Sequence, residues 1–138
     1  MREPTKKTIG DITFEVTPLG FKQGRKAFVR LSKALSPSLG ELTAAKDLFD
    51  AGTIAGALEK LLDHISDEDL DWFAEVMGKG TRFSRDGDKW PFLNEANREA
   101  LFAGNLMLFF QWLVFCFEVN FSDFLGLFKD ALKGGGQG

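Results

Sequence analysis

Three aspartates at alternating positions, Asp67, Asp69 and Asp71, form the part of the sequence that comes closest to a metal-binding motif. A calcium loop beginning at Asp67 would need glycine at its sixth position for a sharp turn. It would also need glutamate at its twelfth position to bind the ion through both oxygens. These positions hold Trp72 and Gly78. The sequence therefore does not predict a calcium site, and we expect Asp67 and Asp69 to lie in the first turn of a helix, where the helix dipole favours negative charge.

The other residues with catalytic potential do not form a known constellation. His64 is the only histidine and Cys116 the only cysteine, so a histidine metal cluster and an intramolecular disulfide are both excluded. Cys116 lies in an apolar stretch, where a buried structural thiol is expected rather than a reactive one. The sequence "GKGT" at 78–81 supplies only four residues of a phosphate-binding loop that needs eight. We expect no enzyme activity, no metal and no cofactor.

Insertion into a bilayer is the next possibility, because residues 108–128 ("LFFQWLVFCFEVNFSDFLGLF") contain seven phenylalanines and one tryptophan. A spanning helix needs about 20 mostly apolar residues. The longest uninterrupted apolar runs here, 106–110 and 112–117, have five and six residues. Glu118 and Asp123 add carboxylates that are costly in a membrane. We therefore expect no membrane span.

The length of 138 residues predicts one domain with a substantial core. We place this domain at residues 1–133 and a flexible glycine-rich tail at 134–138. The charged start "MREPTKKTIGD" lacks the apolar region of a signal peptide, which predicts a cytoplasmic protein.

The N-terminal half is predicted to form a hairpin followed by helices. Gly10-Asp11 is a turn signal within a hairpin at 6–17, whose second strand alternates apolar and polar residues. The helical region covers 19–79. Its first helix is expected at about 19–35, with Phe21 on the buried face, and new helices are expected to begin at Ser36-Pro37, Thr53 and Ser66.

The C-terminal half is predicted to contain a second hairpin at 81–93, centred on Asp86-Gly87, and aromatic helices at 94–132. Asn94 is expected to cap one long helix reaching about residue 119, and Asn120 to begin a short final helix. The predicted fold class is mainly α with small β-hairpins (α+β), arranged as a compact helical bundle around the long apolar C-terminal helix.

The long helix has more apolar surface than one buried face requires. Its small or polar positions recur every seventh residue, at Asn97, Gly104, Gln111 and Glu118. The remaining apolar arc covers roughly 260°, whereas an ordinary buried stripe covers somewhat over about 100°. Either the rest of the chain covers this arc, or another molecule covers part of it. The residues that we predict to bind a partner are Phe109, Phe110, Trp112, Phe115, Phe117, Phe121, Phe124 and Phe128.

Charge is unevenly distributed, although the net charge is only −3. Residues 1–35 carry eight basic and three acidic side chains, whereas residues 36–78 carry two basic and ten acidic ones. The basic helix residues Lys22, Arg25, Lys26 and Arg30 could join the hairpin at 82–90 in a nucleic-acid-binding surface, against which the overall acidity counts. A nucleic-acid-binding or other structural accessory protein is thus the alternative hypothesis. A peripheral membrane role for 121–132 is disfavoured, because this segment lacks a basic polar face.

Four segments in order resemble the tail assembly chaperones of long-tailed bacteriophages: "IGDITFEVTPLG", "RKAFVRLSKAL", "ISDEDLDWFAEVM" and "FEVNFSDFLG". The matching positions in the last segment are Glu118, Val119, Asn120, Phe121, Asp123 and Phe124. The internal tryptophans and the glycine tail have no counterpart in this pattern.

The resemblance implies a non-enzymatic protein that binds the tape measure protein, a long, helical, aggregation-prone client, and helps recruit tail tube subunits around it. It also implies a place in the host cytoplasm and absence from the mature virion. Self-association is a further expectation from the surplus apolar surface.

Overall fold

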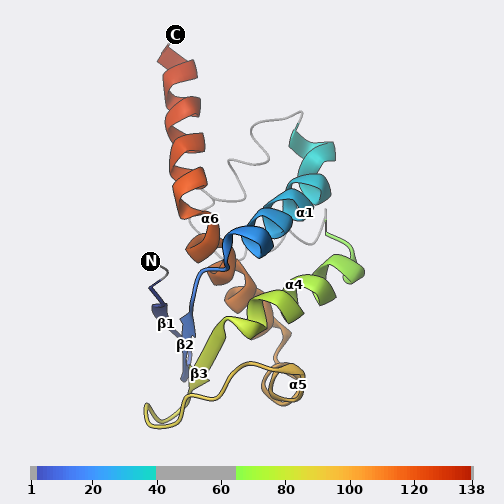
Figure 1. The fold of residues 1–138 in the computed structure, drawn as a ribbon, viewed down its shortest axis with the longest axis vertical. Coiled ribbons are helices and arrows are strands. Elements are labelled where there is room, and N and C mark those ends of the chain that lie inside the picture. The colour runs from blue at the N-terminus through green and yellow to red at the C-terminus, as the bar shows by residue number, and fades with distance from the viewer. Residues whose placement is uncertain (1–2, 40–64, 138) are drawn as a thin grey trace.

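The computed structural model describes residues 3–39 and 65–137, with side chains described for 3–31, 33 and 65–121. These ranges contain three strands, β1 (Thr5–Ile9), β2 (Ile12–Val16) and β3 (Thr81–Ser84), and four helices, α1 (Phe21–Leu39), α4 (Asp67–Lys79), α5 (Glu95–Phe102) and α6 (Leu106–Gln137). The predicted α+β class is confirmed (Figure 1). His64 and the helices predicted between 40 and 64, with their start at Thr53, lie outside the described residues.

The three strands form one antiparallel sheet in the order β1-β2-β3. The predicted N-terminal hairpin is confirmed: Ile9 pairs with Ile12 around Gly10, whose φ is 62°. Phe14 and Val16 are buried, whereas Glu15 on the opposite face is half-buried. The sequence predicts two separate hairpins. In the structure β3 pairs with β2, so that the strands of both predicted hairpins form one sheet.

The second hairpin keeps its turn but not its second strand. Gly87 has a φ of 80°, and the backbone N–H groups of Asp88 and Lys89 donate to the Asp86 carboxylate and lower its pKa. The returning chain makes a single bridge, between Arg82 and Phe92. Phe83 N–H donates to the carbonyl of Pro91 at 3.1 Å, but the proline nitrogen has no hydrogen to return the bond. The ladder therefore stops there.

Helix α1 is longer than predicted and has a different first turn. Ala27 and Leu31 are buried as expected, but Phe21 is 82% exposed, so its predicted burial is wrong. Phe21 is the first helical residue, and the Arg25 guanidinium lies 5.3 Å from its ring. The predicted new helix start at Ser36-Pro37 is also wrong. Pro37 falls in the last turn of α1, where its missing N–H costs the one hydrogen bond to the carbonyl four residues earlier.

Helix α4 begins and ends as its sequence predicts. The Ser66 hydroxyl accepts a hydrogen bond from Asp69 N–H at 3.1 Å, and Gly80 is the C-cap. The Asp69 carboxylate accepts from Arg30 Nε at 2.8 Å. This ion pair links α4 to α1.

The single helix predicted from Asn94 to about residue 119 is wrong. Asn94 caps α5 as expected, but the chain turns at Gly104, which has a φ of 73°, and α6 begins at Leu106. The turn stacks Phe102 on Trp112 with ring centroids 5.6 Å apart. In a straight helix these residues would be separated by roughly 15 Å along the axis. The bend therefore buries aromatic surface that a straight helix would leave apart.

Helix α6 is continuous through Asn120, so the predicted helix start there is wrong. The Asn120 side chain accepts from Leu19 N–H at 2.7 Å and donates to the carbonyl of Cys116 at 2.9 Å. It holds the start of α1 against α6 instead of capping a helix. The structure also continues α6 through glycines 134–136 to Gln137, where the sequence predicts a flexible tail.

The core surrounds the middle of α6, which contacts β1, β2, α4 and α5. Trp112, Leu113 and Cys116 are fully buried on α6, and Phe14 and Phe73 are fully buried on its neighbours. The indole Nε1 of Trp112 donates to the Thr81 hydroxyl at 3.2 Å. In Figure 1 the C-terminal turns of α6 extend beyond the other elements.

Candidate functional site

Six of the eight aromatic residues predicted to bind a partner have described side chains, and these six have two different environments. Trp112, Phe115, Phe117 and Phe121 are buried within the chain itself. Phe109 and Phe110 are half-buried at the surface. The side chains of Phe124 and Phe128 lie outside the described residues, and their role remains a prediction.

The buried members hold the helices together. The rings of Phe117 and Phe73 meet edge to face at 5.1 Å, which packs α6 on α4. Phe121 contacts Phe28 of α1 at 5.8 Å in the same geometry. In this structure these residues build the core that supports the surface.

Phe109 and Phe110 line a surface groove with a volume of about 1110 Å³. Helix α4, the segment before α5, α5 itself and the start of α6 form its walls. Its large apolar residues, besides Phe109 and Phe110, are Leu70, Phe92, Phe102 and Leu106. The sequence indicated the two phenylalanines of α6 but not the contributions of α4 and of the loop before α5.

The floor of the groove is an aromatic cluster that is continuous with the core. Phe109 lies 5.4 Å from Phe102 and 6.0 Å from Trp112, and Phe110 lies 5.0 Å from Phe109, all between ring centroids. Such aromatic pairs contribute about 0.5–1.5 kcal/mol beyond their buried area. The floor is therefore held in place by Trp112, whose side chain is fully buried.

Large apolar side chains at the rim are open to solvent. Leu106 is 67% exposed and Phe92 is 49% exposed, and Met107, beside Leu106 on α6, is 54% exposed. Scattered apolar side chains are ordinary on a protein surface, but adjacent ones around a hollow are typical of an interaction site. The groove thus offers accessible apolar surface on a fixed floor.

Gly78 determines how closely the groove walls approach. A Cβ atom at this position would lie 2.5 Å from the carbonyl oxygen of Leu93 and 2.9 Å from Arg98 Nη1. The same Arg98 nitrogen donates to the Leu93 carbonyl at 3.1 Å. Only glycine lets α4 lie this near to the segment that leads into α5. In the sequence, Gly78 is a glycine next to the last residue of the helical region predicted at 19–79, and nothing around it indicates the contact with Leu93.

The rim of the groove is acidic. Its charged residues are Asp67, Asp71, Glu75, Glu95, Glu99, Lys79 and Arg98. The formal balance of five carboxylates and two cations is −3. Lys79 Nζ lies 3.9 Å from Glu75 Oε1, and Arg98 is engaged with a backbone carbonyl.

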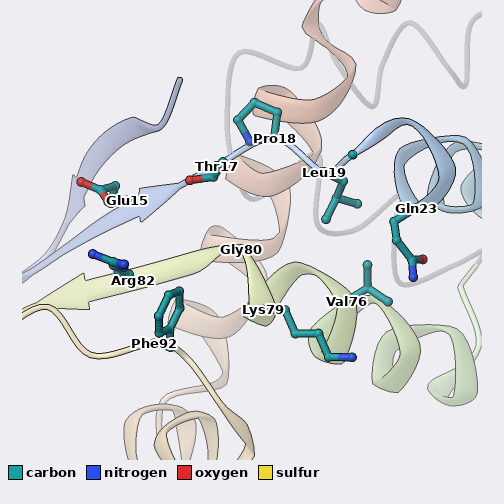
Figure 2. A pocket seen from close by; sticks show the side chains of 11 residues that line it. Glu15, Thr17, Pro18, Leu19, Gln23, Val76, Lys79, Gly80, Arg82 and Phe92 are labelled. Atoms are coloured by element: carbon teal, nitrogen blue, oxygen red, sulfur yellow. The ribbon is translucent and has the colours of Figure 1, made fainter. Parts of the chain in front are cut away.

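A second hollow, of about 540 Å³, lies where β2 and β3 meet the start of α1 (Figure 2). Glu15 and Arg82 face each other across the paired strands. Phe92 and Lys79 line this hollow and the groove, so the two lie next to each other. Its mixed charges do not indicate one class of ligand.

The predicted nucleic-acid surface is not assembled into one patch. Arg25, Lys26 and Arg30 border a hollow of about 700 Å³ on α1, where the Arg30 guanidinium lies 4.8 Å from the Trp72 ring. The loop after β3 lies at the end of the sheet that is far from α1 (Figure 1). Arg82 of the hairpin stacks on Phe92 at 4.6 Å.

Other reactive groups are few in the described part of the chain. Cys116 is fully buried, as predicted, and burial raises the pKa of its thiol far above the usual range. No group of three or more histidine, cysteine or acidic residues is placed to hold a metal ion within residues 3–39 and 65–137. None of the helices described there is long and apolar enough to cross a membrane.

The fold and the groove define a small α+β protein with an open groove of about 1110 Å³ that has apolar side chains in its lining and carboxylates around it. Residues 10–132 match the family model for phage tail assembly chaperone proteins. The chain therefore belongs to the phage tail assembly chaperone family, and the resemblance seen in the sequence is confirmed. Membership suggests a non-enzymatic role and interaction with phage tail proteins. No curated protein and no solved structure matches the chain.

Proposed function

We propose that this chaperone binds the tape measure protein in the host cytoplasm and helps recruit tail tube subunits around it. We further propose that it has no catalytic activity and does not remain in the mature virion. The single observation that carries the binding proposal is the groove, which is lined by the exposed side chains of Leu106 and Phe92 and by the half-buried rings of Phe109 and Phe110.

The shape and chemistry of the groove suit a helical client. A long helix that has not yet assembled exposes an apolar stripe, and covering this stripe prevents aggregation. An amphipathic helix binds a groove by placing apolar side chains at successive turns into it. The groove runs between helices and has an aromatic floor, which supports this mode of binding.

Self-association is the competing use of the same surface. A second copy covering Leu106 and Phe92 would also remove apolar area from water. Sizing the protein alone and with its client distinguishes the two. The proposal expects the client to add mass to the chaperone peak at the expense of any self-associated form.

Co-expression of the tape measure protein with variants of this chain tests the proposal. Leu106→Asp places a charge on the exposed groove rim and is expected to leave most of the client in the insoluble fraction. Phe21→Asp is the matched control, because Phe21 is also strongly exposed but lies on α1, outside the groove. Circular dichroism should show that both variants are folded. Equal client solubility with the two variants would contradict the assignment of the groove.

A further inference from the structure

The acidic residues around the groove follow the helices that form its walls. On α4, Asp67, Asp71 and Glu75 stand four residues apart, and all three line the groove. Residues four apart in a helix lie on the same face, so these carboxylates form a stripe along one wall. The stripe is roughly 12 Å long at 1.5 Å per residue.

A second, shorter stripe lies on α5, which forms another wall of the groove. Glu95 and Glu99 are also four apart on α5, and both line the groove. Leu70 and Phe102, which line the groove too, belong to the same two helices and contribute to the apolar surface bordered by the carboxylates. The groove therefore combines an apolar floor with negative charge on both walls.

The stripes are not explained by helix stability. Like charges four residues apart repel one another and destabilise a helix. Asp67 and Glu95 stand in first turns, where the dipole compensates for this, but Asp71, Glu75 and Glu99 lie further along their helices. Lys79 partly neutralises Glu75, at 3.9 Å. Arg98, which lies between Glu95 and Glu99 on α5, also lines the groove. The five carboxylates and two cations leave a formal balance of −3, and this excess of negative charge points to a partner.

We propose that the occupant of the groove is an amphipathic helix with lysine or arginine along both edges of its apolar stripe. This inference rests on the proposed function and specifies the chemistry of the client segment. The apolar side chains fill the floor while the basic ones face the two carboxylate stripes. Basic residues four apart on the partner match the spacing of the acidic ones on the walls.

Two synthetic peptides test this partner chemistry directly. Both have the same apolar stripe and the same length, and one has lysine at the flanking positions where the other has glutamate. Fluorescence anisotropy with the full chain is expected to show at least about tenfold tighter binding of the lysine peptide, decreasing as salt screens the charges. Equal affinity for both peptides would overturn the proposal.

A charge reversal on α5 tests whether the preference for the lysine peptide arises in the groove. The double variant Glu95→Lys and Glu99→Lys is expected to weaken binding of the lysine peptide and to improve binding of the glutamate peptide. The control is Asp11→Lys with Asp88→Lys, which changes net charge equally at exposed turn positions outside the groove. If both double variants change the preference equally, the effect is one of overall charge and the proposal is wrong.

Two further outcomes separate this inference from the proposed function. Loss of client solubility in Leu106→Asp together with no peptide preference would leave the chaperone function standing and overturn the basic partner. If the chain forms oligomers that Glu95→Lys with Glu99→Lys dissociates, and the lysine peptide does not compete with them, the occupant is another copy and the inference is wrong.

Discussion

Residues 106–110 and 112–121 belong to the same helix and are similarly rich in large apolar residues, yet they meet different surroundings. In the second group, Trp112, Phe117 and Phe121 are covered by the sheet, α4 and α1. In the first group Leu108 is buried, but Leu106 and Met107 are open to solvent, and Leu106 lines the groove. Composition alone does not distinguish a core from a binding surface. The difference comes from which elements pack on each turn of α6.

Loss of Trp112 should have the largest effect, because this residue joins the two groups. Trp112→Ala removes a fully buried indole and its hydrogen bond to Thr81, and should lower the free energy of unfolding by about 3–5 kcal/mol. Leu106→Ala, at an exposed site, should change it by no more than about 0.5 kcal/mol. Urea denaturation followed by circular dichroism measures both.

Trp112→Phe keeps the comparison measurable if the alanine variant does not fold. It retains an aromatic ring beside Phe102 and loses the hydrogen bond, so its destabilisation should lie between those of the other two variants. Similar losses of stability in the Trp112 and Leu106 variants would show that residues 106–110 and 112–121 do not differ in their contribution to the core.

Gly78→Ala should have the next largest effect and should act on the groove. Its methyl group would overlap the Leu93 carbonyl and Arg98, forcing α4 away from the segment before α5 at a cost of about 2–3 kcal/mol. Gly24→Ala is the control, because Cβ there meets nothing closer than 3.8 Å and alanine favours a helix. Thermal unfolding should show a lower melting temperature for the first variant and an equal or higher one for the second. If Gly78→Ala instead melted at a higher temperature than Gly24→Ala, α4 and the segment before α5 could move apart without loss of stability.

Local features of the fold were predictable, because a few neighbouring residues determine them. The caps at Ser66 and Asn94 and the turn at Gly10 follow from side chains that hydrogen-bond nearby backbone or from a glycine that accepts positive φ. The bend at Gly104 was missed. The polar seam continues through it at seven-residue spacing, and the stacking of Phe102 on Trp112 that accompanies the turn is a tertiary contact.

The candidate site was predictable only in part, for the same reason. Phe109 and Phe110 were predicted only as two of eight aromatic residues, four of which are buried in the core. The other apolar contributions come from distant segments, Phe92 from a loop and Leu70 from another helix. The four-residue spacing of the carboxylates is visible in the sequence, whereas their position around one groove depends on how α4 and α5 pack. Pairing of β3 with β2 is similarly a contact between distant segments.

Asn120→Ala should be less destabilising than Trp112→Ala and Gly78→Ala. It tests whether the end of the buried segment 112–121 is stabilised independently of the groove. The side chain of Asn120 satisfies Leu19 N–H, and its removal leaves this donor without its partner, at an expected cost of about 1–2 kcal/mol. Glu118→Ala, at an exposed position of the same helix, should be nearly neutral. Amide hydrogen exchange is the sharper measurement, because the Leu19 amide should lose protection in Asn120→Ala while the groove residues keep theirs. If protection is lost in both places, the anchoring of α1 and the groove form one cooperative unit, and the division of α6 into two independent regions does not hold.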